Sequence, residues 1–156
     1  MTNRNILVSK ISEMSLQSDK FLLNEPYASV YEQDTPSIIL AIREGIGFEA
    51  FSKMFSWSPF SLQEWSRILH LTERSLQRYK KENKTFDTLQ SEKIMQVLLL
   101  YKKGIQVFGT KENFDTWLDT IIPALGHIRP KEILDSAFGI DMIKDELLRI
   151  EHGVLA

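Results

Sequence analysis

The chain has 156 residues, of which 43% are hydrophobic, with no cysteine and a net charge of −2. This length suits one compact domain or two small ones that share a core, and the composition is that of an ordinary globular protein. The absence of cysteine excludes disulfides and thiolate metal sites. No apolar run approaches the length of a membrane span, and residues 1–15 lack the apolar core of a secretory signal. We therefore expect a soluble, cytoplasmic protein that does not bind membranes.

Positive charge is concentrated in one stretch of the chain. Residues 61–95 have seven basic and five acidic side chains, whereas residues 1–60 and 96–156 each have a net charge of −2. Residues 72–84 include five basic and two acidic residues. A local basic patch on a mildly acidic protein suits a focused contact with DNA. A solvated helix face would give the same pattern.

Helix signals begin after a mixed N-terminal segment. Residues 1–34 carry no long apolar stripe and are expected to form an extension. Thr35-Pro36 is typical of a helix start, and Gly45 is expected to end that helix. The next apolar stripe comprises Phe48, Phe51, Met54 and Phe55. No segment shows the sustained alternation of a strand, so the expected fold class is all-α.

Two short helices joined by a tight turn are predicted next. Ser61 and Glu64 have the spacing of a capping box, and Thr72 is expected to cap the second helix. This arrangement is a helix-turn-helix, whose second helix lies in the major groove of DNA. Because Arg and Gln pair with base edges, while Lys contacts phosphates, that helix supplies the candidate DNA-binding residues. They are Thr72, Arg74, Ser75, Gln77, Arg78 and Lys81.

A long helix is predicted over residues 88–108. Its apolar seam has spacings of four, three, four and three residues and comprises Ile94, Leu98, Tyr101, Ile105 and Phe108. One helix-turn-helix makes few base contacts, so sequence-specific binding usually requires a dimer on a palindromic site. The seam could form that dimer face, although packing within its own subunit is the favoured interpretation.

The C-terminal third contains further short helices and no catalytic signature. One helix carries Ile121 and is expected to end at Pro123, and the next is expected to end at Gly139. Asp141 is expected to cap the last helix, and Gly153 to end it. His70, His127 and His152 are too widely spaced in the sequence to suggest a metal site. There is no phosphate-binding loop and no nucleophile elbow. We therefore expect no enzyme activity, no cofactor and no metal.

Several short segments follow one another in order along the chain. They are REGI at residues 43–46, LTERSLQR at 71–78, LQSEK at 89–93, VFG at 107–109, WL at 117–118, PALG at 123–126, PKEILDS at 130–136, Gly139, and LLRIEHGV at 147–154. From about residue 44 onward, the chain resembles the Xre/MbcA/ParS-type antitoxins of bacterial toxin–antitoxin pairs. It departs from the usual residues of that family at His127, Ser136 and His152.

The resemblance implies a helix-turn-helix domain followed by a small, mainly helical toxin-binding domain. The expected parts are an extension over residues 1–34, an Xre-like DNA-binding domain over 35–108 and a toxin-binding domain over 109–156. The implied function is that of an antitoxin, which inhibits a RES-type toxin that consumes NAD or transfers ADP-ribose from it. The antitoxin would also bind the promoter of its own operon, as a homodimer or as a hetero-oligomer with toxin.

By position, the resemblance places the toxin-binding residues in two segments near the C-terminus. They are Trp117, Leu125, Gly126, Arg149, Glu151, His152, Gly153 and Val154. Two alternatives remain. One is a stand-alone helix-turn-helix transcriptional regulator without a toxin partner. The other is an interaction module that does not bind DNA.

Overall fold

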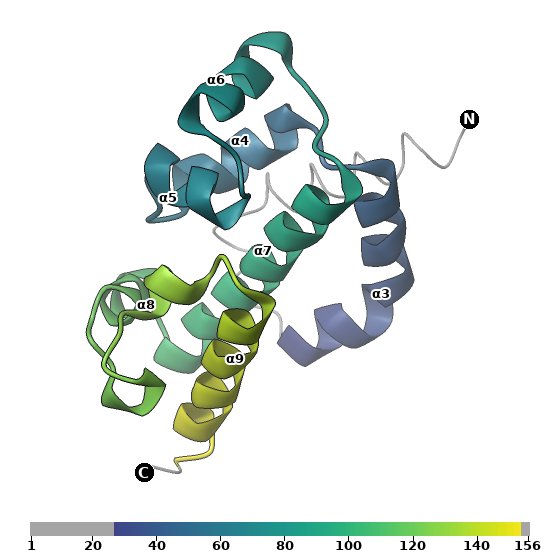
Figure 1. Ribbon diagram of the computed structural model, residues 1–156. Coiled ribbons are helices and arrows are strands. Elements are labelled where there is room, and N and C mark those ends of the chain that lie inside the picture. The colour runs from purple at the N-terminus through teal and green to yellow at the C-terminus, as the bar shows by residue number, and fades with distance from the viewer. Residues whose placement is uncertain (1–26, 154–156) are drawn as a thin grey trace. The chain divides into compact units, whose positions relative to one another are not determined.

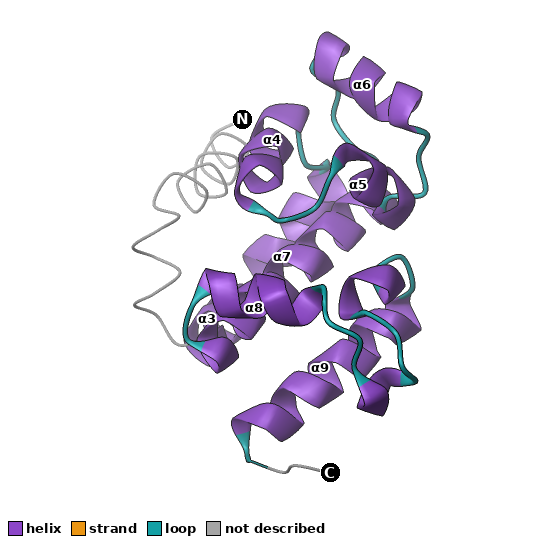
Figure 2. Ribbon diagram, turned by 90° about the vertical axis from the view of Figure 1, so that its left-hand side faces the viewer, coloured by secondary structure: helices purple, strands orange, loops and turns teal. Residues whose placement is uncertain are grey.

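The computed structural model describes residues 27–153 of the chain. The elements are α3 (Tyr27–Glu44), α4 (Phe48–Trp57), α5 (Leu62–Ile68), α6 (Glu73–Glu82), α7 (Thr88–Phe108), α8 (Lys111–Leu118), the 3-10 helices η1 (Pro123–Leu125) and η2 (Pro130–Ile133), and α9 (Ala137–Glu151) (Figure 1). Within the described range there is helix and loop but no strand, so the all-α prediction is confirmed (Figure 2). In that same range, no helix combines the length and hydropathy needed to cross a membrane.

The chain forms two compact units, Met1–Met95 and Gln96–Ala156, and the division between them falls inside α7. The helix predicted over residues 88–108 is confirmed with the same bounds. The seam residues Ile94, Tyr101 and Ile105 are all buried. This burial supports the interpretation that the seam packs within its own subunit.

The core of the first unit is a cluster of aromatic rings from α4, α5 and the segment before α7. The Phe51 ring centroid lies 5.1 Å from that of Trp65 and 5.0 Å from that of Phe86. Both contacts have the edge-to-face geometry that aromatic pairs prefer. The Tyr79 ring extends the cluster, since its centroid lies 5.1 Å from that of Phe86 and thereby brings α6 onto the same core.

A buried serine joins the start of α7 to the turn after α3. The Ser91 hydroxyl accepts a hydrogen bond from the backbone N–H of Ile46 (2.8 Å) and donates one to the carbonyl of Phe86 (3.3 Å). Ser91 is fully buried. The hydroxyl thus satisfies two backbone groups that have no water to bond to.

The first helix starts earlier than the sequence indicated. Thr35-Pro36 does not begin a helix, because α3 already starts at Tyr27 and Pro36 lies inside it. A proline within a helix lacks one N–H donor, and the helix continues across it at that cost. The predicted end is confirmed: α3 stops at Glu44, and Gly45 adopts φ +88°. Residues 1–26, most of the predicted extension, lie outside the described residues.

The core of the second unit is built on the C-terminal half of α7. The Phe114 ring of α8 fills the space where Gly104 of α7 lacks a side chain, because an added Cβ there would lie 2.1 Å from the ring. Phe108 and Trp117 continue this cluster, with ring centroids 5.4 Å apart. The remaining buried apolar side chains of the unit include Leu118, Leu125, Leu134, Ile140, Ile143 and Leu147.

Two helix limits in this unit differ from the prediction. Helix α8 ends at Leu118 rather than near Pro123, so Ile121 is half exposed instead of lying on a buried stripe. The reason is that Ile122 bridges Ile128 in extended conformation, with its N–H donating to the Ile128 carbonyl at 3.0 Å. An extended Ile122 cannot continue the helix.

The last helix begins before the predicted cap. Asp141 does not cap it, because α9 starts at Ala137, and the Ser136 hydroxyl accepts a hydrogen bond from the Gly139 N–H at 3.4 Å. Gly139 therefore lies in the first turn of α9 and does not end the preceding helix. The predicted C-terminal end is confirmed, since α9 stops at Glu151 and Gly153 adopts φ +68°.

Candidate functional site

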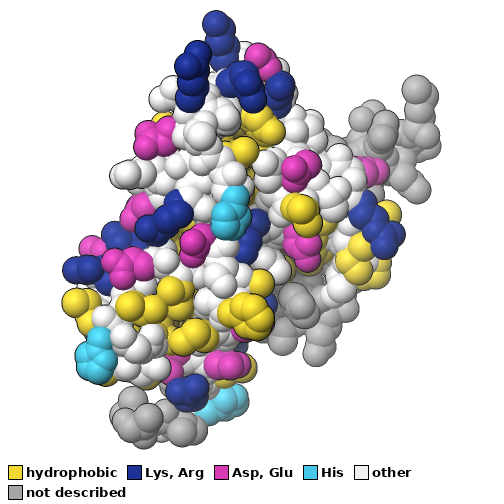
Figure 3. Space-filling view, viewed as in Figure 1, with side chains coloured by type: hydrophobic (Ala, Val, Ile, Leu, Met, Phe, Trp, Pro, Cys, Tyr) yellow, Lys and Arg dark blue, Asp and Glu magenta, His cyan; other side chains and the backbone are white. Residues whose placement is uncertain are grey.

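The first candidate surface is the outward face of α6. Leu76, which is fully buried, and Tyr79 hold the opposite face of this helix against the core. One face therefore points to solvent and carries Arg74, Gln77, Arg78 and Lys81, all exposed. Lys and Arg side chains gather at the top of Figure 3, over α6. Three cations and one amide on a single helix face can bond phosphates and base edges.

The two predicted hydroxyl residues of α6 have a structural role at its start. The Thr72 hydroxyl accepts a hydrogen bond from the Ser75 N–H (3.0 Å) and donates one to the Ser75 hydroxyl (2.9 Å). This is the predicted N-cap of the helix. The capping pair fixes where the first turn of α6 begins and so positions Arg74 on its outward face.

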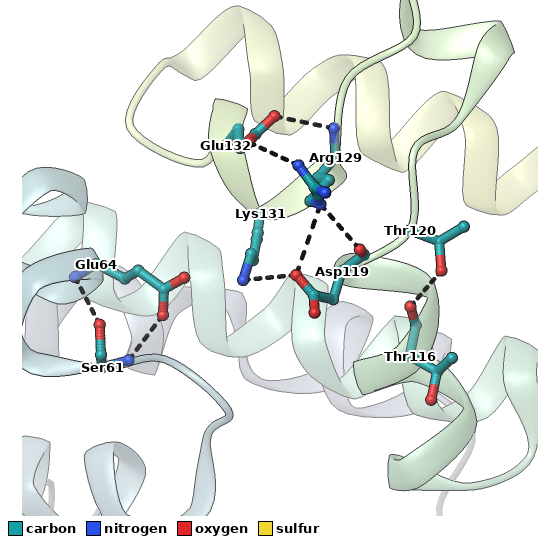
Figure 4. Close-up of polar contacts among 8 residues, drawn as sticks. All are labelled: Ser61, Glu64, Thr116, Asp119, Thr120, Arg129, Lys131 and Glu132. Atoms are coloured by element: carbon teal, nitrogen blue, oxygen red, sulfur yellow. Dashed lines mark hydrogen bonds and ion pairs between the residues drawn. The ribbon is translucent and has the colours of Figure 1, made fainter.

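The turn before α6 fixes how this helix follows α5. Helix α5 opens with the predicted capping box, in which the Glu64 N–H donates to the Ser61 hydroxyl and the Glu64 carboxylate accepts from the Ser61 N–H (Figure 4). His70 adopts φ +53°, a left-handed conformation that reverses the chain, and the Leu71 N–H donates to the Ser66 carbonyl at 2.9 Å. Two capped helices with a left-handed turn between them form a helix-turn-helix.

The second candidate surface lies on the C-terminal unit, where ion pairs fix the segment after α8. Lys131 Nζ lies 2.6 Å from Asp119 Oδ1, and Arg129 Nε donates to the Asp119 carbonyl at 3.1 Å (Figure 4). The hydrogen bond and charge of Lys131, followed by the charge of Arg129, hold the pKa of Asp119 below its usual value. The contacts of Arg129 and Lys131 with Asp119 thus hold together the two ends of the loop that carries Gly126 and His127.

The tip of this loop is exposed in a left-handed conformation. Gly126 has φ +87° and His127 has φ +61°. Such an angle is uncommon for a residue other than glycine. Leu125, immediately before them, is buried instead. The loop therefore presents its backbone and the His127 side chain to solvent, while Leu125 fastens it to the core.

The predicted toxin-binding residues divide into two groups in the structure. Trp117 packs on Phe108, Leu125 is buried, and the Glu151 carboxylate pairs with Lys103 Nζ at 2.6 Å. These three therefore contact their own unit. Glu151 is nevertheless exposed, as are the others that the structure describes, Gly126, Arg149, His152 and Gly153. Val154 lies outside the described residues.

Four apolar side chains of this unit that are not among the predicted site residues are exposed to solvent. Phe138 is 85% exposed, and Ile121, Met142 and Leu148 are each close to half exposed. In Figure 3, hydrophobic side chains gather over the segment after α8 and the start of α9. The available signal was the spacing of four between Phe138 and Met142. With Asp141 as the expected helix start, Phe138 falls outside the predicted helix.

The two surfaces together define a class of protein. A helix-turn-helix unit with an exposed basic helix is followed by a small helical unit that exposes apolar side chains, as in DNA-binding proteins with a second, protein-docking domain. The comparisons with known families agree with this division. Residues 37–98 match the antitoxin Xre-like helix-turn-helix domain, and residues 103–153 match the antitoxin Xre/MbcA/ParS C-terminal toxin-binding domain. The chain belongs to the Xre-type antitoxins.

Two curated relatives are similar over most of their length. An antitoxin Xre of Yersinia enterocolitica is 27% identical over 120 residues, which cover 76% of this chain and 81% of the relative. An antitoxin Xre of Photorhabdus laumondii is 25% identical over 122 residues, which cover 78% and 82% respectively. The similarity thus includes both domains in the same order.

Proposed function

We propose that this antitoxin neutralises a RES-type toxin, which acts on NAD, and that it represses its own operon from the cytoplasm. The observation that carries the proposal is the pairing of an outward basic helix face in one unit with exposed apolar and charged residues at the end of the other. Each surface suits one partner. Neither requires chemistry by the chain itself, because occlusion of an active site and of a promoter both act by binding.

In the proposed repression, α6 enters the major groove of the promoter. Arg74, Gln77 and Arg78 would contact base edges, and Lys81 would contact a phosphate. Thr72 and Ser75 would present their backbone groups and fix the first turn beside the DNA. A homodimer, or a hetero-oligomer with toxin, would place two such helices on the two halves of a palindromic site.

The DNA proposal is tested with Arg74→Ala plus Arg78→Ala. We expect promoter binding in a mobility-shift assay to weaken, with a shallower dependence on salt because fewer counterions are released. The matched control is Lys144→Ala plus Arg149→Ala, which removes two cations from the other unit. Equal binding by the α6 variant and the wild type would exclude α6 as the reading helix.

In the proposed inhibition, the end of α9 carries the C-terminal residues into the toxin's active cleft. Arg149 is exposed at the last turn of the helix and pairs with Glu146 at 3.2 Å. A charged side chain and a small apolar terminus can fill a cleft and exclude NAD from it. Because inhibition would come from occupancy, it would depend on the residues that follow Gly153.

The inhibition proposal is tested by shortening the chain after Gly153. A cut after Gly139 would not be informative, since it removes the buried core residues Ile140, Ile143 and Leu147. We expect the chain that ends at Gly153 to fold with an unchanged melting temperature and to lose protection of cells against the co-expressed product of the neighbouring reading frame. Lys144→Ala is the control variant. Full protection by the shortened chain would contradict the proposal.

The second candidate function is a stand-alone regulator without a toxin, which the basic face of α6 would equally support. Co-purification of the tagged chain with the product of its neighbouring reading frame separates the two. A stable complex, together with falling cellular NAD when the neighbour is expressed alone, is the result expected for an antitoxin. A neighbour that neither binds the chain nor lowers NAD would favour the regulator.

A further inference from the structure

The outward face of α9 begins with two neighbouring apolar side chains. Phe138 is 85% exposed and Met142 is 44% exposed. They are four residues apart, so they lie next to each other on one side of the helix. The opposite side carries Ile140, Ile143 and Leu147, which are almost completely buried. The exposed pair is therefore separate from the apolar face that packs α9 into its unit.

The backbone next to Phe138 is capped and packs closely against η2. The Ser136 hydroxyl caps the first turn, and Gly139 lies so close to η2 that an added Cβ would be 1.9 Å from the Ile133 carbonyl oxygen. The first turn of α9 is thus fixed against backbone, and the side chain before Gly139 points to solvent. An aromatic side chain on a fixed helix turn loses little conformational entropy when it is bound.

The charged residues nearest to this pair on the same face are acidic. Asp141 and Asp145 follow Phe138 by three and seven residues, and both are exposed. Lys144 Nζ lies 3.9 Å from Asp141, so it offsets that charge only weakly. The whole unit has nine acidic and seven basic side chains. The chemistry that complements this surface is an apolar pocket with a basic rim.

We propose that Phe138 and Met142 anchor the toxin through such a pocket, beside the cleft that the C-terminal residues occlude. This inference rests on the proposed antitoxin function and assigns binding and inhibition to different residues. The anchor determines how long the complex lasts, and the residues after α9 determine whether the toxin is inhibited. Both positions fall within residues 103–153, the match to the toxin-binding domain. Aromatic residues, including Phe, are enriched in protein interfaces.

The test is a comparison of Phe138→Ser with Leu89→Ser. Leu89 is 77% exposed and lies at the start of α7 in the other unit, so it is a matched loss of one exposed apolar side chain. The probe is the purified product of the neighbouring reading frame, measured by surface plasmon resonance. We expect Phe138→Ser to weaken binding at least tenfold, mainly through faster dissociation. Leu89→Ser should bind like the wild type.

Inhibition at saturating antitoxin separates the anchor from the occluding end. We expect Phe138→Ser, added in large excess, to inhibit NAD consumption fully, whereas the chain ending at Gly153 binds without inhibiting. Wild-type affinity in Phe138→Ser would overturn the anchor while leaving the antitoxin function intact. No binding by the wild-type chain would overturn both.

A second copy of the chain is the alternative occupant of this face. Light scattering after gel filtration gives the oligomeric state of Phe138→Ser and of the wild type. An unchanged oligomeric state with weakened toxin binding supports the proposal. Dissociation of a wild-type dimer, with toxin affinity unchanged, would overturn it and assign the face to dimerisation.

Discussion

Gly139 lies against the backbone of Ile133, so that a methyl group added at Gly139 would be 1.9 Å from the Ile133 carbonyl oxygen. This approach brings the first turn of α9 onto η2. It explains why a glycine occupies a helical position, where it is otherwise unfavourable. The same contact fixes the direction in which Phe138 leaves the helix.

The first prediction concerns this contact. Gly139→Ala should lower the free energy of unfolding by about 3 kcal/mol, because the clash with backbone outweighs the better helix propensity of alanine. Thermal and urea denaturation measure the change. Gly47→Ala is the control, since Gly47 has φ −72° and no atom within 4 Å of an added Cβ. We expect it to remain within about 0.5 kcal/mol of the wild type. A Gly139→Ala protein as stable as that control would show that η2 can move away.

The second prediction concerns the buried hydroxyl of Ser91. Ser91→Ala leaves the Ile46 N–H without its partner at 2.8 Å. We expect a loss of about 2 kcal/mol, the usual cost of one unsatisfied buried donor. Ser52→Ala is the control, because the Ser52 hydroxyl is exposed and bonds only the carbonyl of its own helix turn at Glu49. Equal urea midpoints for the two variants would mean that the Ile46 N–H finds another acceptor.

The third prediction concerns the ion pair that holds the end of α9. Lys103 Nζ donates to both carboxylate oxygens of Glu151, at 2.7 and 2.6 Å. A double-mutant cycle with Lys103→Met and Glu151→Gln should give a coupling energy of about 1 kcal/mol that decreases with salt. The pair Lys144 and Asp141, 3.9 Å apart and well exposed, should give a coupling near zero. Equal coupling in the two cycles would show that the α9 pair contributes no more than an exposed pair.

The fourth prediction concerns pH and Lys102. Burial lowers the pKa of Lys102 from 10.5 to about 8. Between these values the unfolded chain binds more protons than the folded one, so stability should rise as the pH increases from about 8 toward 10. The pKa of Tyr101 is raised by burial and by its hydrogen bond to Asp115, which opposes the rise once unfolded tyrosine ionises.

The Lys102→Met variant isolates this effect. Its urea midpoint at pH 7 should exceed that of the wild type, and the difference should shrink as the pH approaches 10. Lys93→Met, on the same helix, provides the comparison for the loss of one lysine side chain. A constant difference between Lys102→Met and the wild type would show that Lys102 ionises at its ordinary pKa.

The local signals of the sequence predicted most helix limits. Ser61 with Glu64, Thr72, Gly45 and Gly153 act as caps or stops where they were expected. These limits depend on hydrogen bonds within three or four residues, so neighbouring residues suffice to define them. The basic face of α6 was predictable for the same reason, since helical spacing fixes which side chains share a face.

Three limits were wrong, and for two of them contacts with residues outside the helix are decisive. The bridge between Ile122 and Ile128 ends α8 early, and the approach of Gly139 to Ile133 keeps a glycine inside α9. Helix α3 continues through Pro36, which local rules place at a helix start. A cap motif indicates where a helix can end, whereas tertiary packing determines whether the helix ends there.

The sequence by itself determined the fold class, the helix-turn-helix and the family, because each depends on local spacing and on the order of short segments. Only the tertiary structure decided which side chains of the C-terminal unit face outward. It turned Glu151 toward Lys103, buried Leu125 and left Phe138 exposed. The physical reason is that the direction of a side chain on α9 follows from how the helix packs on η2, and that packing depends on the absent side chain of Gly139.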